Sequence, residues 1–213
     1  MNKAELALRK SIIEACRAMN SLGINQGTSG NISARFEDRM LITPTSVPYD
    51  ELSPGDIMAT PIAGDGTAWT GPLSPSSEWR FHLSILQKRP EIGAVVHTHS
   101  TYATVLAICN KPIPAVHYMV AAAGGPDIRV ARYATFGTEE LSRNALEALE
   151  GRNACLLGNH GVIAAGSHVK RALWLAVEVE TLARQYYLSL AIEGARILPD
   201  DEIARVKEKM KGY

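Results

Sequence analysis

Three histidines and one glutamate are the residues of this chain best suited to chemistry. His97 and His99 lie at the end of the apolar run 94–98, His160 lies in a glycine-flanked turn, and Glu78 follows two serines. Side chains alternate along a strand, so His97 and His99 are expected on one face. Three imidazoles and a carboxylate suit a divalent cation: Zn²⁺ fits best, and Mn²⁺, Co²⁺ or Fe²⁺ fit the same donors.

Each of these residues alone also has an ordinary structural interpretation. A single histidine in an apolar strand is more often a core or surface residue than a metal ligand. The pair His97 and His99 supports the metal hypothesis, because two imidazoles on one strand face are a costly way to fill a core. The group contains no cysteine, which disfavours a purely structural zinc site, and a carboxylate that leaves the metal would open a coordination position for substrate.

Two loops of small and hydroxyl residues are candidates for binding an anion near this group. One is the segment 27–31, Gly-Thr-Ser-Gly-Asn, and the other is Ser76-Ser77. The serines precede a predicted helix, whose N-terminus favours a phosphate, although a turn and an N-cap explain the two loops equally well. Because the serines directly precede Glu78, a phosphate bound there would lie beside the metal.

The pattern along the chain predicts one α/β domain over residues 1–213, with a central sheet and flanking helices. Helices are expected over residues 3–22, 78–88, 100–109, 117–123, 138–149, 168–190 and 200–211, with Ser76 or Ser77 as the N-cap of the second. Strands are expected over residues 32–36, 40–43, 56–60, 94–98, 155–157 and 161–164. The hairpin-like pairs favour a mixed or antiparallel sheet over a doubly wound parallel one.

The composition narrows the range of partners. Lys+Arg and Asp+Glu both number 22, and a chain without net charge is a poor candidate for binding nucleic acid. No apolar run reaches the roughly 18 to 20 residues that span a bilayer, and the first residues lack the apolar region of a signal peptide. Cys16, Cys109 and Cys155 follow no disulfide pattern and are expected to be buried free thiols. We expect a cytoplasmic protein without a nucleic-acid or membrane partner.

Five blocks of the sequence carry a family resemblance that runs nearly end to end. They are Asn25–Ser33, Leu41–Thr45, Ser76–His82, Val95–His99 and His160–Gly161. The chain resembles class II aldolases of the L-fuculose-1-phosphate aldolase and L-ribulose-5-phosphate 4-epimerase type. The resemblance implies a three-layer α-β-α domain with a mixed, largely antiparallel central sheet. It also implies a homotetramer with cyclic four-fold symmetry and active sites at the subunit interfaces.

The family pattern also implies roles for individual residues. His97, His99 and His160 would bind Zn²⁺, and Glu78 would be both a resting ligand and the acid/base. Tyr118 would reach in from the neighbouring subunit as the second catalytic group. The implied phosphate pocket comprises Gly30, Asn31, Thr45, Ser46, Ser76 and Ser77, with Ser46 standing where glycine is usual. The implied lining of the aldehyde end comprises Phe136, Met210 and Tyr213.

The reaction implied by the resemblance is the retro-aldol cleavage of a ketose 1-phosphate to dihydroxyacetone phosphate and an aldehyde. Tyr118 would remove the proton of the C4 hydroxyl, and Glu78 would return a proton to C3. The substrate would be L-fuculose 1-phosphate or a 5-deoxy- or 5-methylthio-ribulose 1-phosphate. Alternatives are a ribulose-5-phosphate 4-epimerase, a methylthioribulose-1-phosphate dehydratase and a non-catalytic adducin-like scaffold. A scaffold would be expected to have lost the metal ligands, and all four are present.

Overall fold

The computed structural model describes residues 1–192 and 194–211, and its centre is a seven-stranded sheet of order β3-β2-β1-β4-β7-β6-β5. The strands are β1 (Asn31–Phe36), β2 (Arg39–Ile42), β3 (Met58–Pro61), β4 (Ala94–Thr98), β5 (Val130–Ala131), β6 (Ala154–Leu157) and β7 (Gly161–Gly166). Among the described strands, every neighbouring pair is antiparallel except β5 and β6. The prediction of a mixed, largely antiparallel sheet is confirmed.

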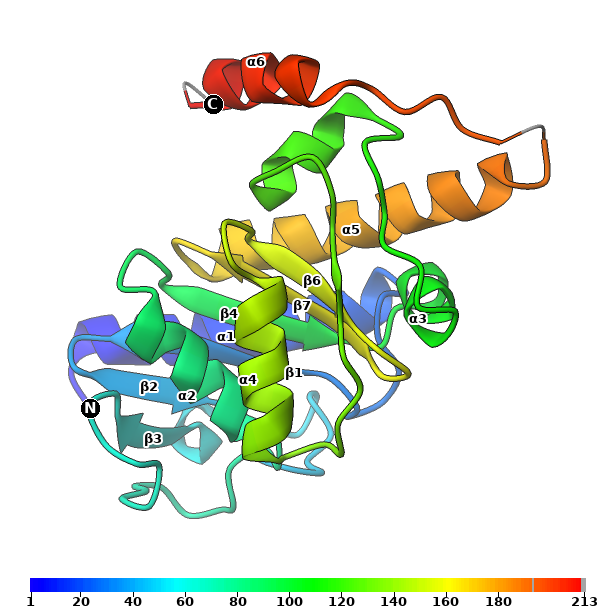
Figure 1. Ribbon diagram of the computed structural model, residues 1–213. Helices are drawn as coiled ribbons and strands as arrows, with labels where there is room; N and C mark the ends of the chain where they lie inside the picture. The colour runs from blue at the N-terminus through cyan, green and yellow to red at the C-terminus, as the bar shows by residue number, and fades with distance from the viewer. Residues whose placement is uncertain (193, 212–213) are drawn as a thin grey trace.

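Helices cover both faces of the sheet and make three layers (Figure 1). The helices are α1 (Lys3–Ser21), α2 (Trp79–Lys88), α3 (Thr101–Ile108), α4 (Glu139–Ala148), α5 (Val169–Ser189) and α6 (Asp200–Met210), with short 3₁₀ turns η1 (Pro54–Asp56) and η2 (Tyr118–Ala123). One apolar core lies between the sheet and α1, α3 and α5, and a second lies between the sheet and α2 and α4. Outside these layers, α6 packs against η2 through Ile203 and Ala121.

Strand β4 lies at the middle of the sheet and is buried along its whole length. Ala94 and Val96 belong to the core beneath α1 and α5, whereas Val95 belongs to the core beneath α2. His97 follows Val95 on the α2 side, where its ring meets the Phe81 ring edge-on at a centroid distance of 5.4 Å. The alternation predicted from the sequence therefore directs His97 toward the segment that carries Glu78.

Most predicted helices and strands match the observed ones within about two residues, and three details differ. Helix α2 begins at Trp79 with Glu78 before it, so the predicted serine N-cap is wrong; the Glu78 N–H instead donates to Ser76 Oγ (3.3 Å) inside the preceding loop. Cys109 is exposed because it follows the last turn of α3, so only Cys16 and Cys155 are buried thiols. The two-residue strand β5 is too short to show a pattern in the sequence.

No helix in the described ranges, 1–192 and 194–211, combines the length and the apolar character needed to cross a membrane.

Candidate active site

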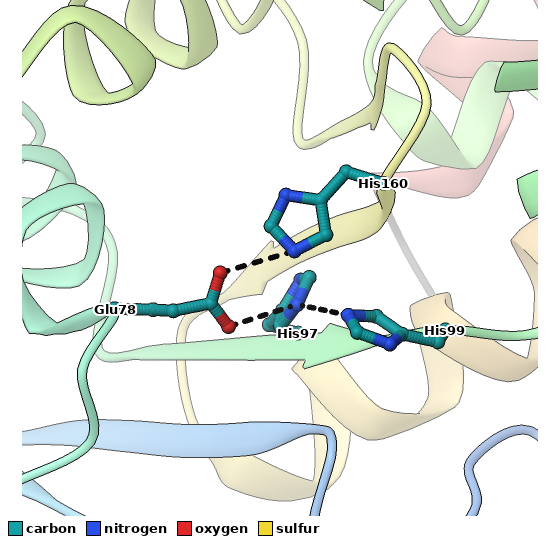
Figure 2. A group of neighbouring side chains, drawn as sticks. All are labelled: Glu78, His97, His99 and His160. Atoms are coloured by element: carbon teal, nitrogen blue, oxygen red, sulfur yellow. Dashed lines mark hydrogen bonds and ion pairs between the residues drawn. The ribbon is translucent and has the colours of Figure 1, made fainter. Parts of the chain in front are cut away.

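Glu78, His97, His99 and His160 form what we call the Glu–His cluster (Figure 2). One possible ligand atom from each residue lies within 4.8 Å of the others. Glu78 Oε2 is 3.1 Å from His97 Nε2, Glu78 Oε1 is 3.0 Å from His160 Nε2, and the Nε2 atoms of His97 and His99 are 3.0 Å apart. The four side chains come from the residue before α2, from β4 and the loop after it, and from the β6–β7 turn. The sheet thus brings together all four residues predicted as ligands.

The pairing of β4 with β7 orients the imidazoles of the cluster. His97 Nδ1 donates to the carbonyl of Val162 on β7 (2.8 Å), which leaves Nε2 directed at the cluster. A side chain at Gly161 would begin 2.4 Å from the carbonyl oxygen of Thr98 and 2.8 Å from the His99 ring. Glycine at this position therefore allows the β6–β7 turn to approach β4 closely enough for His160 to join the cluster.

The charges of the cluster depend on one another. Burial alone would raise the pKa of Glu78, but the charge of His97 and the close contacts with the His160 and His97 imidazoles hold it far below its usual range. Burial and the charges of His97 and His160 lower the pKa of His99 to about 4. Glu78 raises the pKa of His97 against the effect of burial, so a proton there balances the carboxylate. A bound cation would replace that proton, because metal ligands must be deprotonated.

The cluster fits a divalent metal. Glu78 Oε1 is buried and accepts no well-directed hydrogen bond from any described residue, although His160 Nε2 is only 3.0 Å away. A buried carboxylate oxygen without a hydrogen bond costs free energy. Protonation does not solve this for the whole cluster, because one shared proton links only two of the four side chains. A divalent cation among them would bond to all four, and three imidazoles with one carboxylate are donors that such ions prefer.

A cavity of about 380 Å³, here named the cluster cavity, opens onto Glu78, His99 and His160. All six residues predicted to bind phosphate line it, namely Gly30, Asn31, Thr45, Ser46, Ser76 and Ser77. Their hydroxyls and amides surround a space next to the Glu–His cluster, as the position of the serines beside Glu78 suggested. Their role in binding phosphate stays a prediction.

Two loops that form the cluster cavity have constrained backbones. Ser46 has φ +59°, a left-handed conformation that favours glycine, so serine here adopts the backbone that glycine would adopt more easily. A side chain at Gly30 would begin 2.6 Å from both Asn25 Oδ1 and the carbonyl oxygen of His97. The buried Tyr49 hydroxyl donates to the Gly30 carbonyl (2.5 Å), which ties this loop to the protein interior.

Tyr118, predicted as a catalytic group, and the residues predicted for the aldehyde end divide between two cavities. Phe136 lines the mouth of the cluster cavity and is 63% exposed. Tyr118 and Met210 instead line a separate cavity of about 460 Å³, the Tyr118 cavity, together with Arg171 and Trp174. Within the described part of the chain, Tyr118 therefore lies away from the Glu–His cluster. Tyr213 lies outside the described residues.

Four residues of the cluster cavity were not predicted from the sequence, namely Pro44, Tyr133, Ala134 and Asn159. Thr28 and Ser29 also line the cavity and belong to the segment 27–31 that was predicted as an anion-binding loop. Asn159 precedes His160 and has φ +52°. Tyr133 is 61% exposed beside Phe136, and its position depends on the path of a long loop that no local pattern reveals.

Comparison with known proteins identifies relatives over the whole chain. Residues 10–187 match the family described as Class II Aldolase and Adducin N-terminal domain. A 5-methylthioribulose-1-phosphate/5-deoxyribulose-1-phosphate aldolase of Rhodospirillum rubrum is 55% identical over 213 residues, covering 100% of this chain and 95% of that protein. An L-fuculose phosphate aldolase of Escherichia coli (strain K12) is 51% identical over 207 residues, covering 97% and 95%. A solved L-fuculose 1-phosphate aldolase superimposes with a TM-score of 0.92 at 40% identity, with 96% of each chain covered.

Proposed function

Because the chain belongs to the class II aldolase and adducin family, we propose that it is a zinc-dependent lyase that splits a ketose 1-phosphate into dihydroxyacetone phosphate and an aldehyde. One observation carries this proposal: the Glu–His cluster and a pocket of hydroxyls and amides open into the same cavity. Such a cavity can hold a sugar phosphate with its reacting carbons beside the cluster. The intact cluster argues against an adducin-like scaffold.

The bound ion would supply Lewis-acid stabilisation of the negative charge that develops as the carbon–carbon bond breaks. The chain itself supplies positioning and proton transfer. Gly30, Asn31, Ser76 and their neighbours would hold the phosphate and orient the sugar by binding energy remote from the reacting carbons. Glu78, at the boundary between pocket and cluster, would return the proton to C3.

The second catalytic group in this proposal is Tyr118 of a neighbouring subunit in a homotetramer. Tyr118 is half exposed and lines a cavity other than the one beside Glu78. Met210 lines that same Tyr118 cavity, so both residues are available to complete the cluster cavity of an adjacent copy. A site shared between subunits explains why residues needed at one reaction centre lie apart in one chain.

Two substrate classes fit the proposal. L-fuculose 1-phosphate is supported by the Escherichia coli relative, and 5-methylthio- or 5-deoxy-ribulose 1-phosphate is supported by the Rhodospirillum rubrum relative. The exposed rings of Tyr133 and Phe136 at the cavity mouth favour the second class, because they offer an apolar surface to a deoxy or methylthio end.

The deciding experiment incubates the zinc-loaded protein with each of these ketose 1-phosphates and measures dihydroxyacetone phosphate with a coupled dehydrogenase. We expect release that stops when a chelator removes the metal, and kcat/KM identifies the preferred sugar. Epimerised L-ribulose 5-phosphate without cleavage would instead indicate a 4-epimerase, and loss of water from methylthioribulose 1-phosphate would indicate a dehydratase. No turnover of any of these sugars by the metal-bound protein would support a scaffold.

A further inference from the structure

His82 is a fully buried histidine outside the Glu–His cluster, on the first turn of α2. Its Nε2 lies 2.5 Å from Asn31 Oδ1, and its Nδ1 lies 2.8 Å from Ser33 Oγ. Its ring also stacks on Phe81 at a centroid distance of 4.6 Å. A buried imidazole with both nitrogens bonded has a single orientation, and one of its two partners leads directly to Glu78.

That partner is Asn31, whose Nδ2 donates to Glu78 Oε2 (2.9 Å). Ser33, His82, Asn31 and Glu78 thus form one hydrogen-bonded row between β1 and the start of α2. An ionised carboxylate only accepts hydrogen bonds, so Asn31 must turn its NH₂ group toward Glu78 and its oxygen toward His82. The His82 proton must then be on Nε2, and the Ser33 hydroxyl must donate to Nδ1.

The same comparison of hydrogen-bond donors and acceptors excludes the reversed arrangement. If the Asn31 amide were flipped, its oxygen would face the Glu78 carboxylate, and two acceptors would oppose each other in a buried place. A neutral His82 has one donor and one acceptor and fits either pattern, so the Glu78 carboxylate at the end of the row selects the first. Burial and the charge of His97 lower the pKa of His82 to about 3, which keeps the ring neutral under ordinary conditions.

We propose that His82 is a positioning residue that fixes the Asn31 amide, so that Asn31 anchors Glu78 Oε2 and leaves Oε1 free for a cation. This inference rests on the proposed metal-dependent function. Because Asn31 also lines the cluster cavity, the same row joins the predicted phosphate pocket to the carboxylate. Partners of this kind hold a ligand in the orientation that the ion requires.

Two variants separate positioning from packing. His82→Phe keeps a ring against Phe81 but removes both nitrogens, whereas His82→Gln keeps one N–H donor and one acceptor. We expect His82→Phe to weaken Co²⁺ binding roughly 10- to 100-fold, measured from the visible absorption of the bound ion during titration, and His82→Gln to recover most of that loss. Thermal unfolding of the metal-free variants shows whether each one is folded.

A double-mutant comparison tests the route through Asn31. If His82 acts by orienting Asn31, His82→Phe should cause no further loss of Co²⁺ affinity in an Asn31→Ala background. The ¹⁵N chemical shifts of His82 in the metal-free wild type should show a protonated Nε2 and an unprotonated Nδ1. This second measurement stands even if His82→Phe does not fold.

Three results would overturn the inference: unchanged Co²⁺ affinity in a folded His82→Phe variant, a loss that is fully additive with Asn31→Ala, or a proton on Nδ1. A wild-type protein that binds no Co²⁺ or Zn²⁺ would overturn the proposed function instead. In that case, the ¹⁵N chemical shifts of His82 still show which ring nitrogen carries the proton, and therefore the direction of each hydrogen bond between Ser33 and Glu78.

Discussion

At the scale of single residues, the two oxygens of Glu78 have different surroundings. Oε2 accepts from Asn31 and lies 3.1 Å from His97, whereas Oε1 accepts no well-directed hydrogen bond from the described chain. A carboxylate anchored by one oxygen can present the other to a cation or to a carbon that needs a proton. The hypothesis that Glu78 combines both tasks therefore has a structural rationale.

Replacing Glu78 with glutamine tests this double role. The amide cannot transfer the proton, so we expect Glu78→Gln to lower turnover by about 10³-fold or more, while the three histidines still bind a divalent ion with reduced affinity. Release of dihydroxyacetone phosphate and the metal content of the purified variant are the two measurements. Turnover at the wild-type rate would contradict the assignment of Glu78.

Gly30 offers a second test at this scale, because the space beside it is already filled. A methyl group there would meet Asn25 Oδ1 and the His97 carbonyl oxygen at 2.6 Å. We expect Gly30→Ala to lower the free energy of unfolding by about 2 kcal/mol and to raise KM, since the loop that carries Asn31 must move. Gly55→Ala is the matched control: its methyl group would meet only Ser53 Oγ at 3.7 Å, and urea unfolding should show little change. Equal effects of the two substitutions would refute this explanation.

At the scale of elements, α3 starts two residues after His99, and its first turn is held by α5. Glu180 on α5 accepts hydrogen bonds from the backbone N–H groups of Tyr102 and Ala103, each at 2.9 Å. A carboxylate at a helix N-terminus satisfies free donors and interacts favourably with the helix dipole. Helix α5 thereby fixes where α3 begins, and with it the loop that carries His99.

Glu180→Ala should consequently lower the free energy of unfolding by about 2 kcal/mol, since two buried or half-buried donors lose a charged acceptor. We also expect weaker metal binding, because the backbone beside His99 loses its support. Chemical denaturation and Co²⁺ titration measure the two effects. Glu208→Ala, which removes an exposed ion pair with Lys211, is the control and should change stability by less than about 0.5 kcal/mol.

At the scale of the whole molecule, the residues assigned to one reaction lie at two separate cavities. Glu78 and the predicted phosphate pocket share the cluster cavity, whereas Tyr118 and Met210 share the Tyr118 cavity, with the half-exposed Trp174 beside them. Exposed aromatic side chains around a cavity are typical of surfaces that contact another protein. A cyclic assembly that joins the two cavities of adjacent copies would complete the site.

Mixing two inactive variants tests this arrangement. Glu78→Gln and Tyr118→Phe are each expected to be inactive alone. Co-assembled in equal amounts, they should recover about a quarter of wild-type activity, because that share of sites pairs an intact Glu78 with a neighbour's intact Tyr118. A mixture that stays inactive, although native mass spectrometry shows mixed oligomers, would indicate that each chain uses its own Tyr118.

Much of the fold follows from local pattern. The apolar run at residues 94–98 predicted a buried strand at those bounds, and the apolar spacing of residues 168–190 predicted α5 within a residue at each end. Caps follow less directly from the sequence: the Thr138 side chain accepts from the Leu141 N–H and caps α4, but the Ser76–Ser77 pair, predicted as the N-cap of α2, does not cap it. Hydroxyls compete for several nearby N–H groups, and the surrounding loop decides which one they meet.

The sequence by itself determined the donor set of the cluster, the hydroxyl-rich loops and the family. The donor set, the loops and the family can be recognised from residue types and from their spacing within short segments. Within such a segment, strand or turn geometry already decides which side chains share a face. Only the tertiary structure decided that Glu78 and His160 reach β4, that Asn31 links Glu78 to His82, and that Tyr118 faces another cavity. These relations join segments tens of residues apart, and they depend on strand order and helix packing, which no local pattern encodes.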